Sequence, residues 1–177
     1  GRAMFAIRAS LAATMSPLWG VYSGYELYEH QAVAPGSEEY LDSEKYELRP
    51  RDFAAALSSG DSLEPYLTLL NDIRRENPAL QQLRNLTFHD VDNDQLLAYS
   101  KVDAVTGNAV LVVVNLDPRN AQEGTITVDL PAIGQQPGAS YGVTDAVTGA
   151  TWTWGERNFV RLVPTNDVTH ILVLPTV

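Results

Sequence analysis

The stretch Thr125-Ile126-Thr127-Val128-Asp129-Leu130 decides how the second half of this 177-residue chain folds. Its polar and apolar side chains alternate without interruption. Successive side chains of a β-strand point to opposite faces of the sheet, so the alternation predicts a strand with one buried and one hydrated face. We expect Ile126, Val128 and Leu130 to lie together in a core.

Further segments with the composition of strands lie on both sides of this stretch. They are short and are separated by turn signals such as Asp117-Pro118 and Pro137-Gly138. The predicted strands are residues 96–99, 109–116, 124–130, 141–144, 151–154, 159–163 and 170–174. About seven short strands at this spacing are typical of an antiparallel β-sandwich. We therefore predict a β-sandwich domain over residues 85–177.

The pentapeptide Asp-Ala-Val-Thr-Gly occurs twice, at residues 103–107 and 145–149. Its aspartate can hydrogen-bond to the backbone ahead of it, and its glycine tolerates a positive φ, so each copy predicts a tight turn. The residues that follow the two copies differ. This favours the reuse of one turn over an internal repeat.

The first 84 residues have a helical period instead. Apolar side chains recur every three or four residues from Met4 to Met15, which predicts a helix that ends before Ser16-Pro17. The apolar run at residues 18–24 opens into glycine and predicts a buried strand. A second helix, capped by Asp61, is predicted to end at Asn77-Pro78. Its apolar stripe consists of Leu63, Tyr66, Leu67, Leu70 and Ile73.

A long segment at residues 25–60 shows no sustained period, and stretches of this length are usually functional or disordered. In a parallel α/β barrel it would follow the carboxyl end of a strand, where active sites are built. Lys45 and Tyr46 add a cation and a phenol, which suit the recognition of a polyol or a phosphate. A solvated acidic loop with one incidental lysine explains the spacing equally well.

Composition limits the partners that we expect. The net charge of −10 disfavours nucleic acid and anionic lipid, and no apolar stretch reaches the roughly 18 residues of a membrane span. The sequence has no cysteine, which fits a reducing compartment, and we expect a cytoplasmic protein. Neutral sugars remain compatible with this charge.

No cofactor or metal is expected. The three histidines have no ligand spacing, and His89 and His170 are interpreted as structural residues of strands. Asp90, Asp92 and Asp94 resemble the start of a calcium loop, but Gln95 and Lys101 occupy the positions of the required glycine and glutamate. We interpret this segment as an acidic hairpin turn.

Trp152 and Trp154 are two residues apart on one predicted strand, so their side chains share a face. Paired aromatic faces can stack on sugar rings, but such a pair more often packs into a core. Core packing is the favoured interpretation, and a sugar-binding platform is the alternative.

Several of these segments together resemble the end of an α-amylase superfamily chain (glycoside hydrolase family 13). The general matches are YSGYE at residues 22–26, IRRENPAL at 73–80 and VVVNLD at 112–117. The segment PGSEEYLDSEKYELRPRD at residues 35–52 is similar to the corresponding loop of bacterial α-1,4-glucan:maltose-1-phosphate maltosyltransferases. YGVTD at 141–145, VRLVP at 160–164 and THI at 169–171 are similar to the last domain of that family. The resemblance covers essentially the whole chain, and YLDSEKYE at 40–47 is its most specific part.

The resemblance implies an α+β chain: the C-terminal end of a (β/α)₈ barrel, with two helices and one strand, followed by an antiparallel β-sandwich. Residues 1–84 would be the barrel remnant, with the active-face loop at 25–60, and residues 85–177 the sandwich. It also implies retaining transfer of maltosyl units from α-maltose 1-phosphate to the non-reducing end of an α-1,4-glucan by a longer, homodimeric enzyme. The catalytic carboxylates would lie upstream, so Glu26 is not a catalyst, and Lys45 and Tyr46 match positions that bind donor sugar.

Two other functions are compatible with parts of the sequence. Another superfamily enzyme, such as a trehalose synthase, is distinguished only by the loop at residues 25–60. A non-catalytic β-sandwich carbohydrate-binding module would explain the acidic surface and the two tryptophans, but not residues 1–80.

Overall fold

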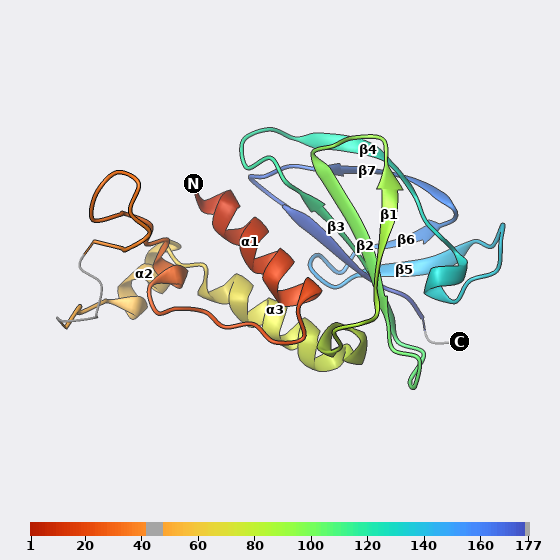
Figure 1. The fold of residues 1–177 in the computed structure, drawn as a ribbon, viewed down its shortest axis with the longest axis horizontal. Helices are drawn as coiled ribbons and strands as arrows, with labels where there is room; N and C mark the ends of the chain where they lie inside the picture. Colours follow the sequence, from red (N-terminus) through yellow and green to blue (C-terminus); the bar gives the residue numbers. More distant parts are fainter. Residues whose placement is uncertain (42–47, 176–177) are drawn as a thin grey trace.

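The computed structural model describes residues 1–41 and 48–175, in which helices lie beside a rolled antiparallel sheet (Figure 1). The helices are α1 (Arg2–Met15), α2 (Phe53–Ser59) and α3 (Glu64–Glu76), with 3₁₀ turns η1 (Tyr25–Leu27), η2 (Pro78–Gln81) and η3 (Pro131–Ile133). The strands are β1 (Leu86–Val91), β2 (Leu96–Val102), β3 (Ala109–Asn115), β4 (Gln122–Thr127), β5 (Tyr141–Asp145), β6 (Thr151–Trp154), β7 (Arg157–Leu162) and β8 (Thr169–Val173). This mixture of helix and antiparallel sheet confirms the α+β prediction.

The eight strands form one continuous sheet in the order β6-β5-β8-β3-β2-β1-β4-β7. All the pairings are antiparallel, as predicted. One end of β1 pairs with β2 through Leu86↔Lys101, and its other end pairs with β4 through Asp90↔Thr127. Because β1 belongs to both pairings, the expected two-layer sandwich is a single sheet rolled into a near-barrel.

The interior of the rolled sheet holds the core that the alternating stretch predicts. Ile126, Val128 and Leu130 are 0%, 2% and 3% exposed, which confirms that they share a buried face. The seven residues of β3 are all buried, because this central strand is covered on both faces. Its odd-numbered residues from Ala109 to Val113 face the interior, and its even-numbered residues pack against the helices.

The helices α1 and α3 complete a second core on the outer face of the sheet. Ile7 and Ala13 of α1 and Leu70 of α3 pack into one cluster with Val112 and Ile171 of the sheet. The predicted apolar stripe of α3 lies in this cluster, which explains its helical spacing. The helical segment therefore shares its core with the sheet.

Two basic side chains donate hydrogen bonds to backbone carbonyls at the carboxyl end of α1. Lys101 of β2 donates hydrogen bonds from Nζ to the carbonyls of Met15 (3.3 Å) and Gln82 (2.5 Å). Arg74 of α3 donates to the carbonyls of Ser16 (2.9 Å) and Pro17 (2.7 Å). Cations satisfy the free carbonyls and the negative dipole of a helix end. Burial lowers the pKa of Lys101 to about 8.

Several predictions for the first 84 residues are wrong in detail. Residues 18–24 form no strand, and Leu18 and Tyr22 are 85% and 60% exposed. An apolar run becomes a parallel strand only beside other strands, and no segment that the structure describes pairs with this one. The single strand of the predicted barrel remnant is therefore absent, and the described residues contain three α-helices instead of two.

The second predicted helix begins later than expected. It starts at Glu64, whose amide donates to Ser62 Oγ at 3.1 Å. Asp61 does not cap this helix, because its carboxylate pairs with Arg2. The helix ends at Asn77-Pro78, as predicted.

The predicted turns are confirmed. In the two pentapeptides, Asp103 and Asp145 each accept a hydrogen bond from the backbone amide two residues on (3.1 Å) and one from the following threonine hydroxyl. Gly107 and Gly149 have φ of 73° and 77°. The acidic segment 90–94 joins β1 to β2, and Asp92 Oδ1 accepts a hydrogen bond from Thr125 N at 2.6 Å.

Candidate functional site

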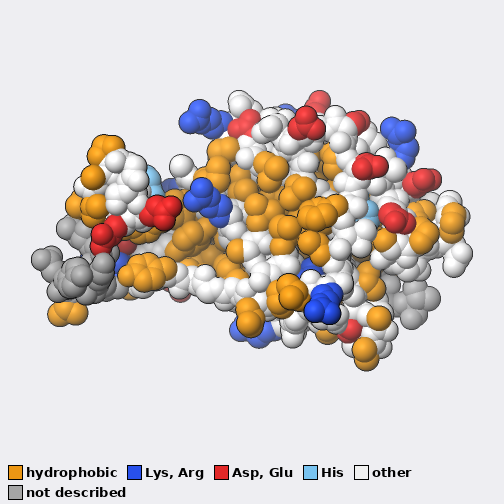
Figure 2. Space-filling view, viewed as in Figure 1, with side chains coloured by type: hydrophobic (Ala, Val, Ile, Leu, Met, Phe, Trp, Pro, Cys, Tyr) orange, Lys and Arg blue, Asp and Glu red, His pale blue; other side chains and the backbone are white. Residues whose placement is uncertain are grey.

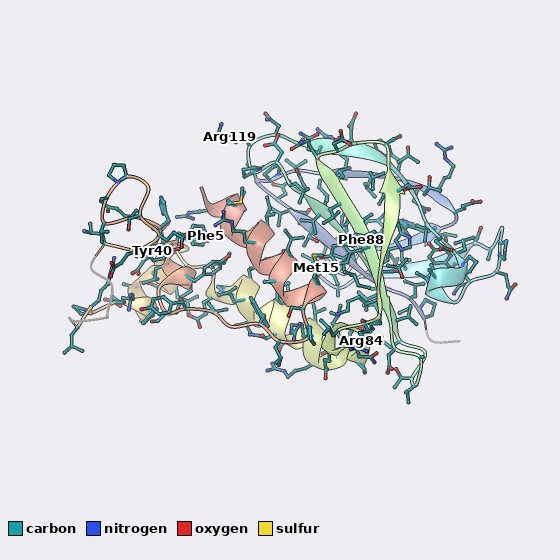
Figure 3. All side chains as sticks on the ribbon, viewed as in Figure 1. Phe5, Met15, Tyr40, Arg84, Phe88 and Arg119 are labelled. Carbon is teal, nitrogen blue, oxygen red and sulfur yellow. The ribbon has the colours of Figure 1, made fainter. Side chains whose placement is uncertain are left out.

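A cleft of about 240 Å³ opens in the segment between α1 and α2, and we call it the loop cleft. It is lined by Tyr28, Glu29, His30, Gln31, Tyr40, Leu41 and Arg49. Figure 3 shows Tyr40 and Phe5 near this end of the molecule, away from the sheet. The loop cleft therefore belongs to the segment that the sequence analysis selects.

Glu29 is the electrostatic centre of the loop cleft. Arg51 binds its carboxylate with two hydrogen bonds, from Nε at 2.8 Å and from Nη2 at 3.1 Å. Arg49 Nε lies 3.3 Å from the same carboxylate, and Arg49 Nη1 donates to the Leu41 carbonyl at 2.7 Å. The hydrogen bonds from Arg51 hold the pKa of Glu29 below its ordinary value. Glu29 is thus a fixed anion that organises the loop.

Gly24 lets the backbone approach this carboxylate. Its φ is 98°, and a Cβ at this position would lie 2.2 Å from Glu29 Oε2. Only glycine combines that φ with that approach at no steric cost. The Gly24 amide also donates to Glu26 Oε2 at 3.0 Å, so Glu26 has a structural partner here.

Aromatic side chains attach the loop cleft to α1. The ring of Phe5 lies 4.8 Å from that of Tyr25 and 5.4 Å from that of Tyr28, in tilted and edge-on arrangements. The Tyr25 hydroxyl donates to the Phe5 carbonyl at 2.6 Å. Burial raises the pKa of Tyr25, so this phenol stays protonated as a donor.

The predicted site residues Lys45 and Tyr46 lie outside the described residues. The chain on both sides of them is described. Leu41, before them, and Arg49, after them, both line the loop cleft. An antiparallel bridge between Ala32 and Tyr40 fixes the direction in which the chain reaches Leu41. The segment that carries Lys45 and Tyr46 thus starts and ends at this cleft.

The chemistry of the loop cleft favours binding over catalysis. Its one carboxylate is paired with two arginines, so it is not available as a proton donor near neutral pH. In the described ranges 1–41 and 48–175, no group of histidine, aspartate and glutamate side chains could hold a metal ion. Hydroxyl, guanidinium and aromatic groups in one cleft suit the recognition of a neutral sugar.

A second cleft of about 270 Å³ lies at the edges of the rolled sheet, and we call it the seam cleft. It is lined by Trp152, Trp154, Phe159, Val160, Arg161 and His170. Trp154 is 7% exposed and belongs to the interior core, whereas Trp152 is 40% exposed. The favoured interpretation of core packing therefore holds for Trp154 alone, and the pair does not form a flat platform.

Sequence reasoning missed most of these residues. Glu29, Arg49 and Arg51 are far apart in sequence and carry no recognisable spacing. Gly24 carries no signal of its own in the sequence, because a glycine marks a close backbone approach only once its neighbours are known. Phe159 and His170 join Trp152 only through the strand order of the sheet.

Residues 88–174 match a family model described as "GLGE, C-terminal". The chain is 71% identical to an α-1,4-glucan:maltose-1-phosphate maltosyltransferase of Corynebacterium glutamicum, in an alignment that covers 99% of the chain. It is 59% identical over its full length to the protein of the same name from Mycolicibacterium smegmatis. The chain belongs to the maltosyltransferase family. It spans about a quarter of the length of these relatives (26% and 25%).

The fold is also similar to that of a solved amylase. A noncanonic maltogenic α-amylase from Thermotoga neapolitana matches 98% of the maltosyltransferase-family chain with a TM-score of 0.63, and the match covers 36% of the amylase. The sequences are 12% identical, so this likeness concerns the fold alone. Within the described residues, no helix is both long and apolar enough to cross a bilayer.

Proposed function

We propose that the whole protein containing this chain transfers maltosyl units from α-maltose 1-phosphate to the non-reducing end of an α-1,4-glucan, with retention of the α linkage. The observation that carries this proposal is the 71% identity to a maltosyltransferase across 99% of the chain. The acidic net charge of −10 and the sugar-compatible loop cleft are consistent with a neutral glucan acceptor.

In this proposal, residues 1–84 are the end of a (β/α)₈ catalytic barrel and residues 85–177 are the domain that follows it. Exposed apolar side chains in residues 18–22 support a further covering element: Leu18 is 85%, Val21 41% and Tyr22 60% exposed. Figure 2 shows that hydrophobic side chains also form a broad face around α1 and the neighbouring strands. Faces of this kind are typical of surfaces that pack against other parts of a protein.

The loop cleft supplies binding groups, and the reaction needs two further carboxylates. Retaining transfer uses one carboxylate as the nucleophile and a second as the acid and then the base. The resemblance to the family implies that these groups come from the rest of the enzyme. Glu29, held by two arginines, and Glu26, bound by a backbone amide, have structural partners instead. Lys45 and Tyr46 have the proposed role of binding the donor sugar through their ammonium and hydroxyl donors.

The location and assembly of the enzyme follow from the same proposal. A phosphorylated sugar donor and the absence of cysteine from this sequence favour the cytoplasm. We place the full-length enzyme there as a homodimer. Sedimentation of the full-length enzyme tests the homodimer, and a single monomeric species would refute it.

The deciding experiment supplies the full-length enzyme with α-maltose 1-phosphate and a short maltooligosaccharide. We expect phosphate release together with products that are longer by two glucose units. A parallel reaction supplies free maltose alone, and its conversion to trehalose would instead assign a trehalose synthase. The 177-residue chain alone should release no phosphate, because it lacks the proposed nucleophile, and detectable release by it would contradict the proposal.

A further inference from the structure

The walls of the seam cleft come from opposite ends of the sheet. β6 and β7 are its two terminal strands, and among the described residues they do not pair with each other. Gly155 and Glu156 connect them directly along the chain. In a closed barrel, the edges of β6 and β7 would be joined by backbone hydrogen bonds. Because they are not paired here, a ligand can lie between them.

An exposed aromatic ring stands on each wall. Trp152 on β6 is 40% exposed, and Phe159 on β7 is 66% exposed. Trp154, two residues from Trp152, reaches the core and is 7% exposed. Large aromatic rings gain about 25 cal/mol per Å² when they leave water, so two exposed rings across one cleft favour a ligand with apolar faces.

The polar side chains of the cleft are held in place by their own partners. Asp145, whose side chain is fully buried, accepts a hydrogen bond from Nδ1 of His170 at 2.9 Å. The ring of Trp152 meets the His170 ring edge-on, with 5.3 Å between the centroids. His170 Nε2 has no hydrogen-bond partner in the part of the chain that the structure describes. A fixed imidazole with one free nitrogen therefore remains to meet a ligand.

The carboxylate that orients His170 is well satisfied. Asp145 also accepts hydrogen bonds from Thr148 Oγ1 at 2.8 Å and from the Ile171 amide at 3.0 Å. At the rim, Arg161 lies 3.4 Å from Glu123, and both side chains are more than half exposed. The cleft thus combines apolar rings with a donor and an acceptor at its edge.

We propose that the seam cleft binds a segment of α-1,4-glucan between Trp152 and Phe159, with His170 and Arg161 hydrogen-bonding its hydroxyl groups. A glucose ring has apolar faces and a hydroxyl-bearing rim, which match these two kinds of side chain. The identity of the glycan as an α-1,4-glucan rests on the proposed function. The volume of about 270 Å³ lies near the lower limit of about 300 Å³ for ligand pockets, so a short segment of a longer chain fits best.

The charge of the molecule favours this ligand over an anionic one. The sequence has 22 acidic and 12 basic side chains, and Arg161 in the cleft is paired with Glu123. A phosphate group would meet only the Arg161 guanidinium, which is already paired with a carboxylate, on a protein of net negative charge. A neutral glycan has no such penalty.

The test is the mobility of the full-length enzyme in native gels that contain glycogen. Trp152→Ala should raise the apparent dissociation constant for glycogen about tenfold, because it removes one stacking face. Phe88→Ala is the matched control, since Phe88 is a 56% exposed aromatic residue on β1 that does not line the cleft. The melting temperatures of both variants are measured to exclude unfolding.

The outcomes separate this inference from the proposed function. Retardation that falls with Trp152→Ala and not with Phe88→Ala supports the seam cleft. Equal retardation of all three proteins, or an equal loss in both variants, overturns it. An enzyme that turns over α-maltose 1-phosphate, and whose glycogen retardation is unaffected by Trp152→Ala, leaves the proposed function intact and refutes the seam cleft. An enzyme that does not turn over α-maltose 1-phosphate, but whose glycogen retardation falls with Trp152→Ala, refutes the proposed function alone.

Discussion

The loop cleft and the seam cleft both combine aromatic rings with basic side chains that pair with a carboxylate, yet they are built in opposite ways. The loop cleft uses residues from one stretch of chain, held by the ion pairs of Glu29. The seam cleft uses residues from β6, β7 and β8, held by strand ladders. Damage to the loop should therefore stay local, whereas damage to the seam cleft reaches the core of the sheet.

Removing the charge of Glu29 should have the largest effect. The side chains of Glu29 and Arg51 are 14% and 5% exposed, so Glu29→Gln removes the carboxylate that accepts two hydrogen bonds from this buried guanidinium. Loss of one partner of a buried ion pair costs about 3 kcal/mol, which corresponds to a roughly 100-fold loss of hydrogen-exchange protection. We expect this loss in the amides of residues 24–41 and not in the sheet amides. Glu38→Gln, at an exposed position of the same loop, is the control.

Gly24→Ala should have the next largest effect. The added Cβ would meet the Glu29 carboxylate at 2.2 Å, and alanine would also have to adopt a φ of 98°. Together these should destabilise the loop by about 2 kcal/mol. Gly60→Ala separates the two causes, since Gly60 has a φ of 76° with open space around it. If hydrogen exchange shows the same loss of protection at both positions, the close approach to Glu29 contributes nothing.

Asp145→Asn tests the seam cleft through the same chemistry. The substitution removes a buried negative charge that accepts hydrogen bonds from His170, Thr148 and the Ile171 amide. We expect about 1–2 kcal/mol of lost stability in thermal unfolding, together with weaker retardation by glycogen. Asp103→Asn changes the turn with the same pentapeptide between the central strands β2 and β3, next to Gln82, and should leave retardation unchanged. Weaker retardation in both variants would mean that the loss reflects stability and not the position of His170.

A smaller effect is expected from pH. Burial alone would raise the pKa of Asp145, but the hydrogen bonds from His170, Thr148 and the Ile171 amide outweigh burial and lower it. The resulting stability is fully present above about pH 4, where aspartate in the unfolded chain is ionised, and is lost as the pH falls through the lower folded-state pKa. The melting temperature of Asp145→Asn should therefore fall less steeply than that of the wild type between pH 5 and pH 3. Parallel slopes would show that Asp145 does not contribute.

The sheet was largely predictable because polar and apolar side chains alternate along its strands. The period of two in residues 125–130 is set by burial of one face, and the structure bears it out. Residues 18–24 misled the prediction because an apolar run indicates burial but not a pairing partner. The strand β1 was left out of the predicted set, although His89 on it was correctly interpreted as structural: His89 Nε2 lies 2.9 Å from Ser100 Oγ.

The clefts were less predictable than the sheet. Trp152 and Trp154 have the spacing of one strand face, but their difference in burial depends on where that strand lies at the edge of the sheet. The ion pairs of Glu29 join residues that are 20 and 22 positions apart, which no local period records. The sequence could select the loop by its lack of a hydrophobic period and by its resemblance to a known family. The contacts inside the loop depend on the three-dimensional fold and could not be predicted.

The central claim is that the segment bordered by Leu41 and Arg49 binds the donor sugar, and Lys45→Ala in the full-length enzyme tests it most directly. The account predicts that kcat/KM for α-maltose 1-phosphate falls by about 10- to 150-fold, which is the loss of one hydrogen bond to a charged group of roughly 1.5–3 kcal/mol. The melting temperature should stay unchanged. An unchanged kcat/KM would remove Lys45 from the donor site and contradict the claim.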